Sequence, residues 1–264
     1  MKQRFAFAAV AAFITLALSV YAGRAADSQH LPPLLLPGVG SHDPRTPVHI
    51  DTMPWRAIGK LQATSGNLYE SCTGTLIAPA LVLTAAHCVF NLRTQENFPP
   101  SALHFLIGYE RDSYVGHAVG RRIKVGNGFD PKHPEQTRGS DWALIVLEKA
   151  LGTGGRILPV SAEPPEIGSS VMLGGYSQDY PHVIMADTAC RIVGRLTDTA
   201  GRPLLRDDCT GGSGVSGAPL LIKRDGGWSV AAIAVAAEMG TASGIAVLPD
   251  KARKLADADA AGAR

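Results

Sequence analysis

The sequence predicts an all-β protein whose strands fall into two sets of six. Short apolar runs alternate with Gly, Pro, Asn and Asp at the intervals typical of β-barrels or β-sandwiches. A turn-rich stretch over residues 151–169 separates the two sets and is predicted to link two domains. The first set of runs lies near residues 56–63, 73–77, 81–85, 103–109, 116–125 and 142–147. The second set lies near residues 170–175, 189–196, 203–206, 218–223, 228–236 and 244–248.

Residues 1–25 have the pattern of a secretory signal peptide. Lys2 and Arg4 precede a long apolar stretch, and Gly23 and Ala25 suit the −3 and −1 positions of a cleavage site. The alternative is an uncleaved membrane anchor, because the apolar stretch approaches the length that spans a bilayer. No other stretch is as long and apolar, so we expect a secreted or periplasmic protein without membrane attachment after cleavage.

Residues 26–53 contain several prolines and little hydrophobic periodicity. Proline fixes φ and removes a hydrogen-bond donor, so we expect neither a regular helix nor a central strand in this segment. It is predicted to be a pro-segment or an N-terminal arm lying on the first domain. The two β domains are predicted over residues 54–150 and 170–249, followed by a short helix or tail at 250–264.

Composition and cysteine content exclude several classes of protein. The formal net charge is +2, and no basic run exceeds two consecutive residues, so neither nucleic acid nor a membrane surface is an expected partner.

The four cysteines all follow the signal segment, and an even number in an exported chain predicts disulfides in one of three connectivities. A zinc site would compete for these residues, but no C-x-x-C or H-E-x-x-H spacing occurs. We expect no metal and no cofactor.

Residues 209–222 surround a serine with glycines and then enter an apolar run. Gly214 and Gly217 allow the backbone to turn tightly around Ser216, which would leave the serine hydroxyl exposed. The N–H groups of Gly214 and Ser216 could then converge on an oxyanion. Glycine-serine runs are also common in solvated loops, and Ser213 is a second candidate. We favour Ser216 because Gly-Ala-Pro and a strand-like run follow it.

A serine nucleophile needs a base and a group that orients the base. All eight histidines precede Ser216, so the order serine, acid, histidine is excluded. His87 follows an apolar run and two alanines, and the other seven histidines are interpreted as solvated or structural. Asp141 opens the apolar run D-W-A-L-I-V-L, where a buried carboxylate could accept the imidazole Nδ1–H. An aspartate before a strand is otherwise usually a turn residue.

The motifs T-A-A-H-C, D-W-A-L-I-V-L and G-V-S-G-A-P-L place His87, Asp141 and Ser216 in that order, 54 and 75 residues apart. Over residues 54–249 the chain resembles the trypsin/chymotrypsin-like serine proteases. The resemblance implies two antiparallel six-stranded β-barrels with the active site at their interface, and a short C-terminal helix. It further implies that His87 is the general base, Asp141 its orienting partner and Ser216 the nucleophile. Gly214 and Ser216 would supply the oxyanion-hole amides.

The segment C-T-G-T-L-I-A-P, which begins at Cys72, resembles the disulfide hairpin of the family's first barrel. We therefore favour Cys72–Cys88 and Cys190–Cys209, with one bridge in each barrel. Each bridge would close a loop of fewer than twenty residues and contribute about 3 kcal/mol on the chain-entropy model. The first bridge would also brace the backbone beside His87.

The chain departs from the digestive members of the family at the position before the nucleophile. Those members carry an aspartate there that pairs with a newly cleaved N-terminus, whereas this chain has Val215 and no I-V-G-G-like start. Activation by a charged N-terminus is therefore not expected. Cys209 lies seven residues before Ser216, which resembles the bacterial secreted branch of the family, including its glutamyl endopeptidases.

The substrate pocket is predicted from the same resemblance. Its members are Thr210, Val235, Ala236, Ala237 and Gly244, which favour a small or apolar residue before the scissile bond. Ala234 stands where Glu-specific relatives place a histidine, although Glu238 and Asp208 could add charge nearby.

The predicted function is a secreted serine endopeptidase that acts as a monomer on protein or peptide substrates through an acyl-enzyme. The alternatives are a catalytically inactive, protease-like binding protein and an esterase that uses the same triad.

Overall fold

A computed structural model describes residues 36–66, 68–153 and 155–249, together with Ala252 and Lys254. Within these residues the protein is all-β, and the described helical segments of the two domains are four short 3-10 turns. The turns are η1 (Trp55–Ala57), η2 (His87–Val89), η3 (Pro100–Ala102) and η4 (Arg138–Ser140). The predicted fold class is confirmed.

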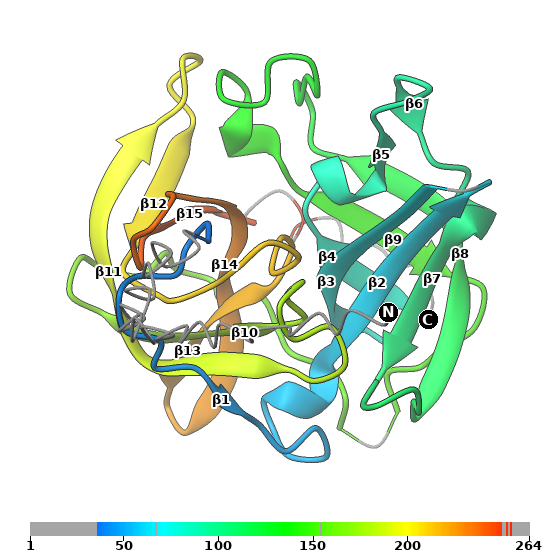
Figure 1. Ribbon diagram of the computed structural model, residues 1–264, viewed down its shortest axis with the longest axis horizontal. Helices are drawn as coiled ribbons and strands as arrows, with labels where there is room; N and C mark the ends of the chain where they lie inside the picture. The colour runs from blue at the N-terminus through cyan, green and yellow to red at the C-terminus, as the bar shows by residue number, and fades with distance from the viewer. Residues whose placement is uncertain (1–35, 67, 154, 250–251, 253, 255–264) are drawn as a thin grey trace, which may run out of the picture. The chain divides into compact units, whose positions relative to one another are not determined.

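Six antiparallel strands form a closed first barrel, in the order β2-β3-β4-β9-β8-β7 (Figure 1). The strands are β2 (Ile58–Ser65), β3 (Leu68–Ala78), β4 (Leu81–Thr84), β7 (Leu103–Ile107), β8 (Gly116–Val125) and β9 (Ala143–Leu147). A small hairpin of β5 (Phe90–Asn91) and β6 (Glu96–Asn97) follows η2. The barrel interior is filled by aromatic and branched side chains, and Phe105 lies directly over the Cα positions of Gly59 and Gly74, where a larger residue would not fit.

Six further strands form the second barrel, in the order β11-β10-β13-β14-β15-β12, which β11–β12 pairing closes. They are β10 (Ser170–Gly175), β11 (Met185–Thr197), β12 (Pro203–Asp207), β13 (Pro219–Arg224), β14 (Gly227–Ala237) and β15 (Gly244–Val247). The N-terminal arm adds the short strand β1 (Thr46–Pro47) to the outer edge of β11, where Thr46 pairs with Ala186.

The two barrels meet along β3 and the segment that follows β10. The hydroxyl of Tyr176 donates a hydrogen bond to the Tyr109 carbonyl at 2.7 Å, and its amide donates to Thr73 Oγ1 at 2.9 Å. Tyr176 is fully buried, so these bonds satisfy polar groups that would otherwise be left unpaired between the barrels. The candidate site lies at this contact between the two barrels, which is called the seam below.

Several strands begin at other residues than the sequence predicted. Residues 56–57 belong to the turn η1 rather than to a strand, and β11 begins at Met185, four residues before its predicted start. The predicted signal peptide lies outside the described residues. Of the predicted C-terminal helix, only Ala252 and Lys254 are described, and both are helical. Among the described residues, none belongs to a helix with the length and hydropathy needed to cross a membrane.

Candidate active site

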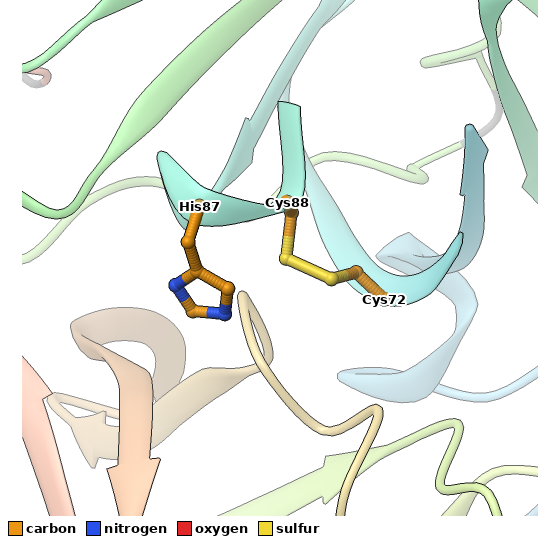
Figure 2. Close-up of side chains that lie close together, drawn as sticks. All are labelled: Cys72, His87 and Cys88. Carbon is orange, nitrogen blue, oxygen red and sulfur yellow. A yellow bond between two sulfur atoms is a disulfide. The ribbon is translucent and has the colours of Figure 1, made fainter. Parts of the chain in front are cut away.

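His87 begins the turn η2 immediately after the buried strand β4. Ala85 and Ala86 are fully buried, so the backbone leading into the histidine is fixed by packing. The next residue, Cys88, is joined by a disulfide to Cys72 in β3. Figure 2 shows the imidazole projecting from this turn beside the disulfide. The His87 side chain is 34% exposed, which leaves one side of the ring open to a substrate.

Asp141 ends the turn η4 and uses both carboxylate oxygens to hold His87. Its Oδ2 lies 2.7 Å from His87 Nδ1, and its Oδ1 accepts the His87 backbone N–H at 2.9 Å. With a buried carboxylate at Nδ1, the neutral imidazole carries its proton there and leaves Nε2 as the acceptor. Burial opposes protonation of the ring, but the charge and hydrogen bond of Asp141 outweigh it and raise the pKa of His87.

Ser216 lies in the loop between β12 and β13, and Thr73 of the first barrel anchors that loop. The Thr73 amide donates to the Ser216 carbonyl at 2.9 Å, and Thr73 Oγ1 donates to the Gly214 carbonyl at 3.2 Å. The Ser216 carbonyl oxygen also lies 3.7 Å from Cys88 Sγ. The serine backbone therefore sits against the disulfide and next to the turn that carries His87.

Two glycines let the loop approach the first barrel this closely. Gly214 and Gly217 have φ values of +94° and +81°, a region that favours glycine. A Cβ on Gly217 would collide with the Thr73 carbonyl and with Thr84 Oγ1. The N–H groups of Gly214 and Ser216 donate no hydrogen bond to any residue that the structure describes. Two free amides on either side of Val215 are suited to stabilise an oxyanion.

A cavity of about 140 Å³ opens beside Ser216. The predicted pocket residues Val235, Ala236, Ala237 and Gly244 line it. Thr210 does not line it: the residue is 2% exposed, and its amide donates to Asp187 Oδ2 at 2.9 Å. The family resemblance implied a pocket position for Thr210, whereas its two neighbours Cys209 and Gly211 line the cavity.

The nearby acids that the sequence suggested also lie elsewhere. Asp208 is exposed and accepts the Arg191 amide, while Glu238 forms an ion pair with Arg206. Neither lines the cavity.

Sequence reasoning missed Asp207, which lines the cavity and is 1% exposed. Its Oδ1 accepts the Cys209 amide at 3.1 Å, and its Oδ2 has no hydrogen-bond partner among the described residues. Both oxygens lie against Gly244, where a Cβ would be 2.8 Å and 2.9 Å from them. Burial raises the pKa of Asp207 to about 7. Alternation along β12 could have revealed it, because Leu205 and Asp207 face the same side of the strand and both are buried.

The arm contributes Pro37 and Gly38 to the same cavity, which the sequence did not predict. Gly38 donates its amide to the Glu238 carbonyl at 2.7 Å, and its carbonyl accepts the Gly211 amide at 2.9 Å. Gly38 of the arm is thus bonded to the glycine-rich loop through Gly211 and to the segment after β14 through Glu238.

Cys72, His87 and Cys88 form the one described group of three potential metal-ligating side chains within 4.8 Å of one another. Both cysteines belong to the first disulfide, as Figure 2 shows, so neither offers a thiolate. The second disulfide joins Cys190 to Cys209.

The family model described as Trypsin matches residues 46–248. The chain belongs to the trypsin family. Its matched region contains both barrels and every side chain of the candidate site except the arm residues before Thr46.

Among curated proteins, this trypsin-family chain is 31% identical over 116 residues to a human chymotrypsin-like elastase family member 3B. That match covers 42% of this chain and 39% of the relative. The chain is also 26% identical over 218 residues to the CLIP domain-containing serine protease B10 of Anopheles gambiae, covering 66% of this chain and 57% of that protein. The chain therefore spans less than two thirds of these relatives.

Among solved structures, a Glu endopeptidase in complex with MPD superposes with a TM-score of 0.67 at 22% identity. The superposition covers 84% of this trypsin-family chain and 98% of the other. At this level of identity the comparison concerns the fold.

Proposed function

We propose that this trypsin-family chain is an exported serine endopeptidase in which His87, Asp141 and Ser216 form the catalytic triad. The proposal rests mainly on the two hydrogen bonds between Asp141 and His87. One carboxylate oxygen of Asp141 is paired with His87 Nδ1, and the other accepts the His87 backbone amide. This arrangement fixes both the tautomer and the orientation that a general base needs. The Ser216 carbonyl, which accepts the Thr73 amide, lies 3.7 Å from Sγ of Cys88, the residue after that base, and this supports the assignment of Ser216 as the nucleophile.

In the proposed reaction, Ser216 Oγ attacks the peptide carbonyl while His87 Nε2 takes the hydroxyl proton. The carbonyl oxygen becomes an oxyanion that the amides of Gly214 and Ser216 stabilise. Collapse of this intermediate breaks the C–N bond, and His87 returns its proton to the departing amine. Water then attacks the acyl-enzyme, giving one proton to His87, which passes it to Ser216 Oγ as the acid leaves. Because this sequence starts from neutral His87, activity falls as the pH drops through the raised pKa of that ring.

The cavity lining supports a preference for a residue of modest size before the scissile bond. Its walls are the small residues Ala234, Ala236 and Ala237, and the neighbouring Asp207 carboxyl disfavours an acidic side chain. Glutamyl specificity, as in the structural neighbour, is therefore not part of the proposal. The bacterial secreted branch is proposed from Val215 and the position of Cys209. Export is proposed from the signal-like N-terminus and is supported by two disulfides, which persist in oxidising compartments.

A fluorophosphonate probe tests the proposal directly. We expect stoichiometric labelling of the folded protein at Ser216, loss of labelling in Ser216→Ala, and normal labelling in the matched control Ser213→Ala. Failure of the folded protein to label would favour a protease-like binding protein. A panel of peptides and simple esters then separates an endopeptidase from an esterase, because only the former cleaves internal peptide bonds.

A further inference from the structure

The arm before the first barrel places an arginine inside the second barrel's active-site loops. Arg45 immediately precedes β1, and its side chain is only 1% exposed. Its Nη1 donates to the Gly211 carbonyl at 2.7 Å, and its Nη2 donates to Asp179 Oδ2 at 2.6 Å. Nε and Nη2 also hold both carboxylate oxygens of Asp43, at 2.9 Å and 2.8 Å. A buried cation with this many acceptors is fully satisfied, which is the condition for burying a charge without a large penalty.

Arg45 joins two loops that meet at the nucleophile. Asp179 belongs to the loop after β10, and Gly211 belongs to the loop that carries Ser216. These loops are joined a second time by the Gln178 amide, which donates to the Ser213 carbonyl at 2.6 Å. Burial opposes ionisation of Asp179, but the hydrogen bonds and charge of Arg45 outweigh it and lower its pKa. The ion pair therefore stays formed across neutral pH.

Two arm residues supply the hydrogen-bond partners of the Gly211 amide and carbonyl. The Gly211 carbonyl accepts from Arg45, and the Gly211 amide donates to the Gly38 carbonyl at 2.9 Å. The loop that follows contains Gly212, Gly214 and Gly217, and such a glycine-rich segment loses much conformational entropy when ordered. An anchor at its first residue reduces the freedom of the amides that would bind the oxyanion.

The residue before Ser216 cannot supply such an anchor. Val215 is apolar and 5% exposed, so the loop has no carboxylate there to pair with a charged N-terminus. We propose that Arg45 is a positioning residue that orders the nucleophile loop from the arm, so that residues 37–53 remain part of the working enzyme. This inference rests on the proposed peptidase function. It assigns the arm a role in the active state rather than that of a segment discarded on activation.

The experiment compares Arg45→Met and Arg45→Lys in the full chain with Arg224→Met as the control. Arg224 also makes hydrogen bonds through its guanidinium, but its acceptors are Ser161 Oγ and backbone carbonyls away from the nucleophile loop. For folded Arg45→Met, we expect the fluorophosphonate labelling rate and kcat to fall about 100-fold, the effect of losing one oxyanion donor, with a smaller change in KM. Arg45→Lys should restore little, because an ammonium cannot bridge these acceptors as a planar fork does. Arg224→Met should label at the normal rate.

Two further measurements separate positioning from plain stabilisation. Millimolar guanidinium should partly restore labelling of Arg45→Ala and leave Ser216→Ala inactive. If Arg45 served stability alone, the folded fraction of the Arg45 variants would have a normal kcat. Intact mass of the probe-labelled natural protein should include residue 45. Labelled protein that lacks residue 45, or normal kcat in folded Arg45→Met, would overturn the inference. If the unmodified protein does not label at all, the proposed function fails instead.

Discussion

Asp141 of the first barrel and Asp207 of the second are buried carboxylates beside the candidate active site, and their surroundings differ. Asp141 in the first barrel is 3% exposed, and Asp207 in the second is 1% exposed. Asp141 places its two oxygens on the amide and the imidazole of His87. Asp207 accepts one amide through Oδ1, while its Oδ2 has no hydrogen-bond partner in the described part of the chain. The two carboxylates are similarly buried but differ in how many of their oxygens are hydrogen-bonded.

The difference lies in the neighbouring charges. A buried carboxylate is stabilised by hydrogen-bond donors and opposite charge, and destabilised by desolvation and other acids. His87 can become a cation beside Asp141, whereas the charges of Asp208 and Asp187 add to the effect of burial on Asp207 and raise its pKa. We infer that the first carboxylate serves the chemistry and that the second shapes the substrate cavity.

The largest expected effect comes from exchanging each carboxylate for an amide. Asp141→Asn keeps the shape but loses the negative acceptor for Nδ1–H, so the imidazole no longer holds the required tautomer. We expect kcat to fall about 10⁴-fold, as in the triad template. The matched variant Asp207→Asn should retain kcat within several-fold, because this side chain does not contact His87. Steady-state kinetics on one peptide substrate measures both, and equal losses in kcat would remove the distinction between the carboxylates.

The next effect compares two glycines of similar conformation in different places. Gly217 has φ +81° at the seam between the barrels, and Gly226 has φ +79° in the outer hairpin of β13 and β14. A Cβ on Gly226 meets nothing within 4 Å, whereas one on Gly217 meets the Thr73 carbonyl and Thr84 Oγ1. Gly226→Ala should cost about 1–2 kcal/mol of unfolding free energy for the left-handed backbone alone. Gly217→Ala should cost several kcal/mol, on the order of 4, because the collision is with backbone.

Urea unfolding gives both free energies, and probe labelling should be lost only in Gly217→Ala. If the two alanine variants unfold at the same urea concentration, the seam is less tightly packed than the structure indicates.

The disulfides provide a third comparison, one in each barrel. They close loops of similar length, with sequence separations of 16 and 19, so removal of either should cost about 3 kcal/mol on the chain-entropy model. Their effects on activity should differ. Replacing Cys72 and Cys88 with serine loosens the turn that holds His87 and should lower kcat, whereas replacing Cys190 and Cys209 loosens a cavity wall and should mainly raise KM. The same direction of change in both double variants would contradict this separation.

Local patterns in the sequence predicted most of the strands because strand formation depends on neighbouring residues, and the triad assigned from the same motifs stays a prediction. The apolar run before His87 is β4, and the run after Asp141 is β9, so alternation and turn residues located both. The resemblance placed Thr210 in the pocket, whereas its neighbours Cys209 and Gly211 line the cavity and the Thr210 amide donates to Asp187. The role of Arg45 could not be seen, because Gly211 lies 166 residues away in sequence and only the folded chain brings them together.

The smallest expected effect is the dependence of stability on the ionisation of Asp207. Its pKa is about 7 in the folded protein, compared with an ordinary value of 3.8. Between these values the unfolded chain releases this proton and the folded protein keeps it. The contribution to the free energy of unfolding is therefore fully present below the unfolded pKa and is lost as the pH rises toward 7.

Asp207→Asn removes this titration, so the variant should gain stability relative to the natural protein on going from pH 5 to pH 8, by an amount on the order of 1–3 kcal/mol. Urea unfolding at the two pH values measures the difference, and Asp225→Asn in the exposed turn between β13 and β14 serves as the control. A relative stability of Asp207→Asn that does not change with pH would mean that the Asp207 carboxyl is already ionised at pH 5. The cavity would then carry a full negative charge at both pH values.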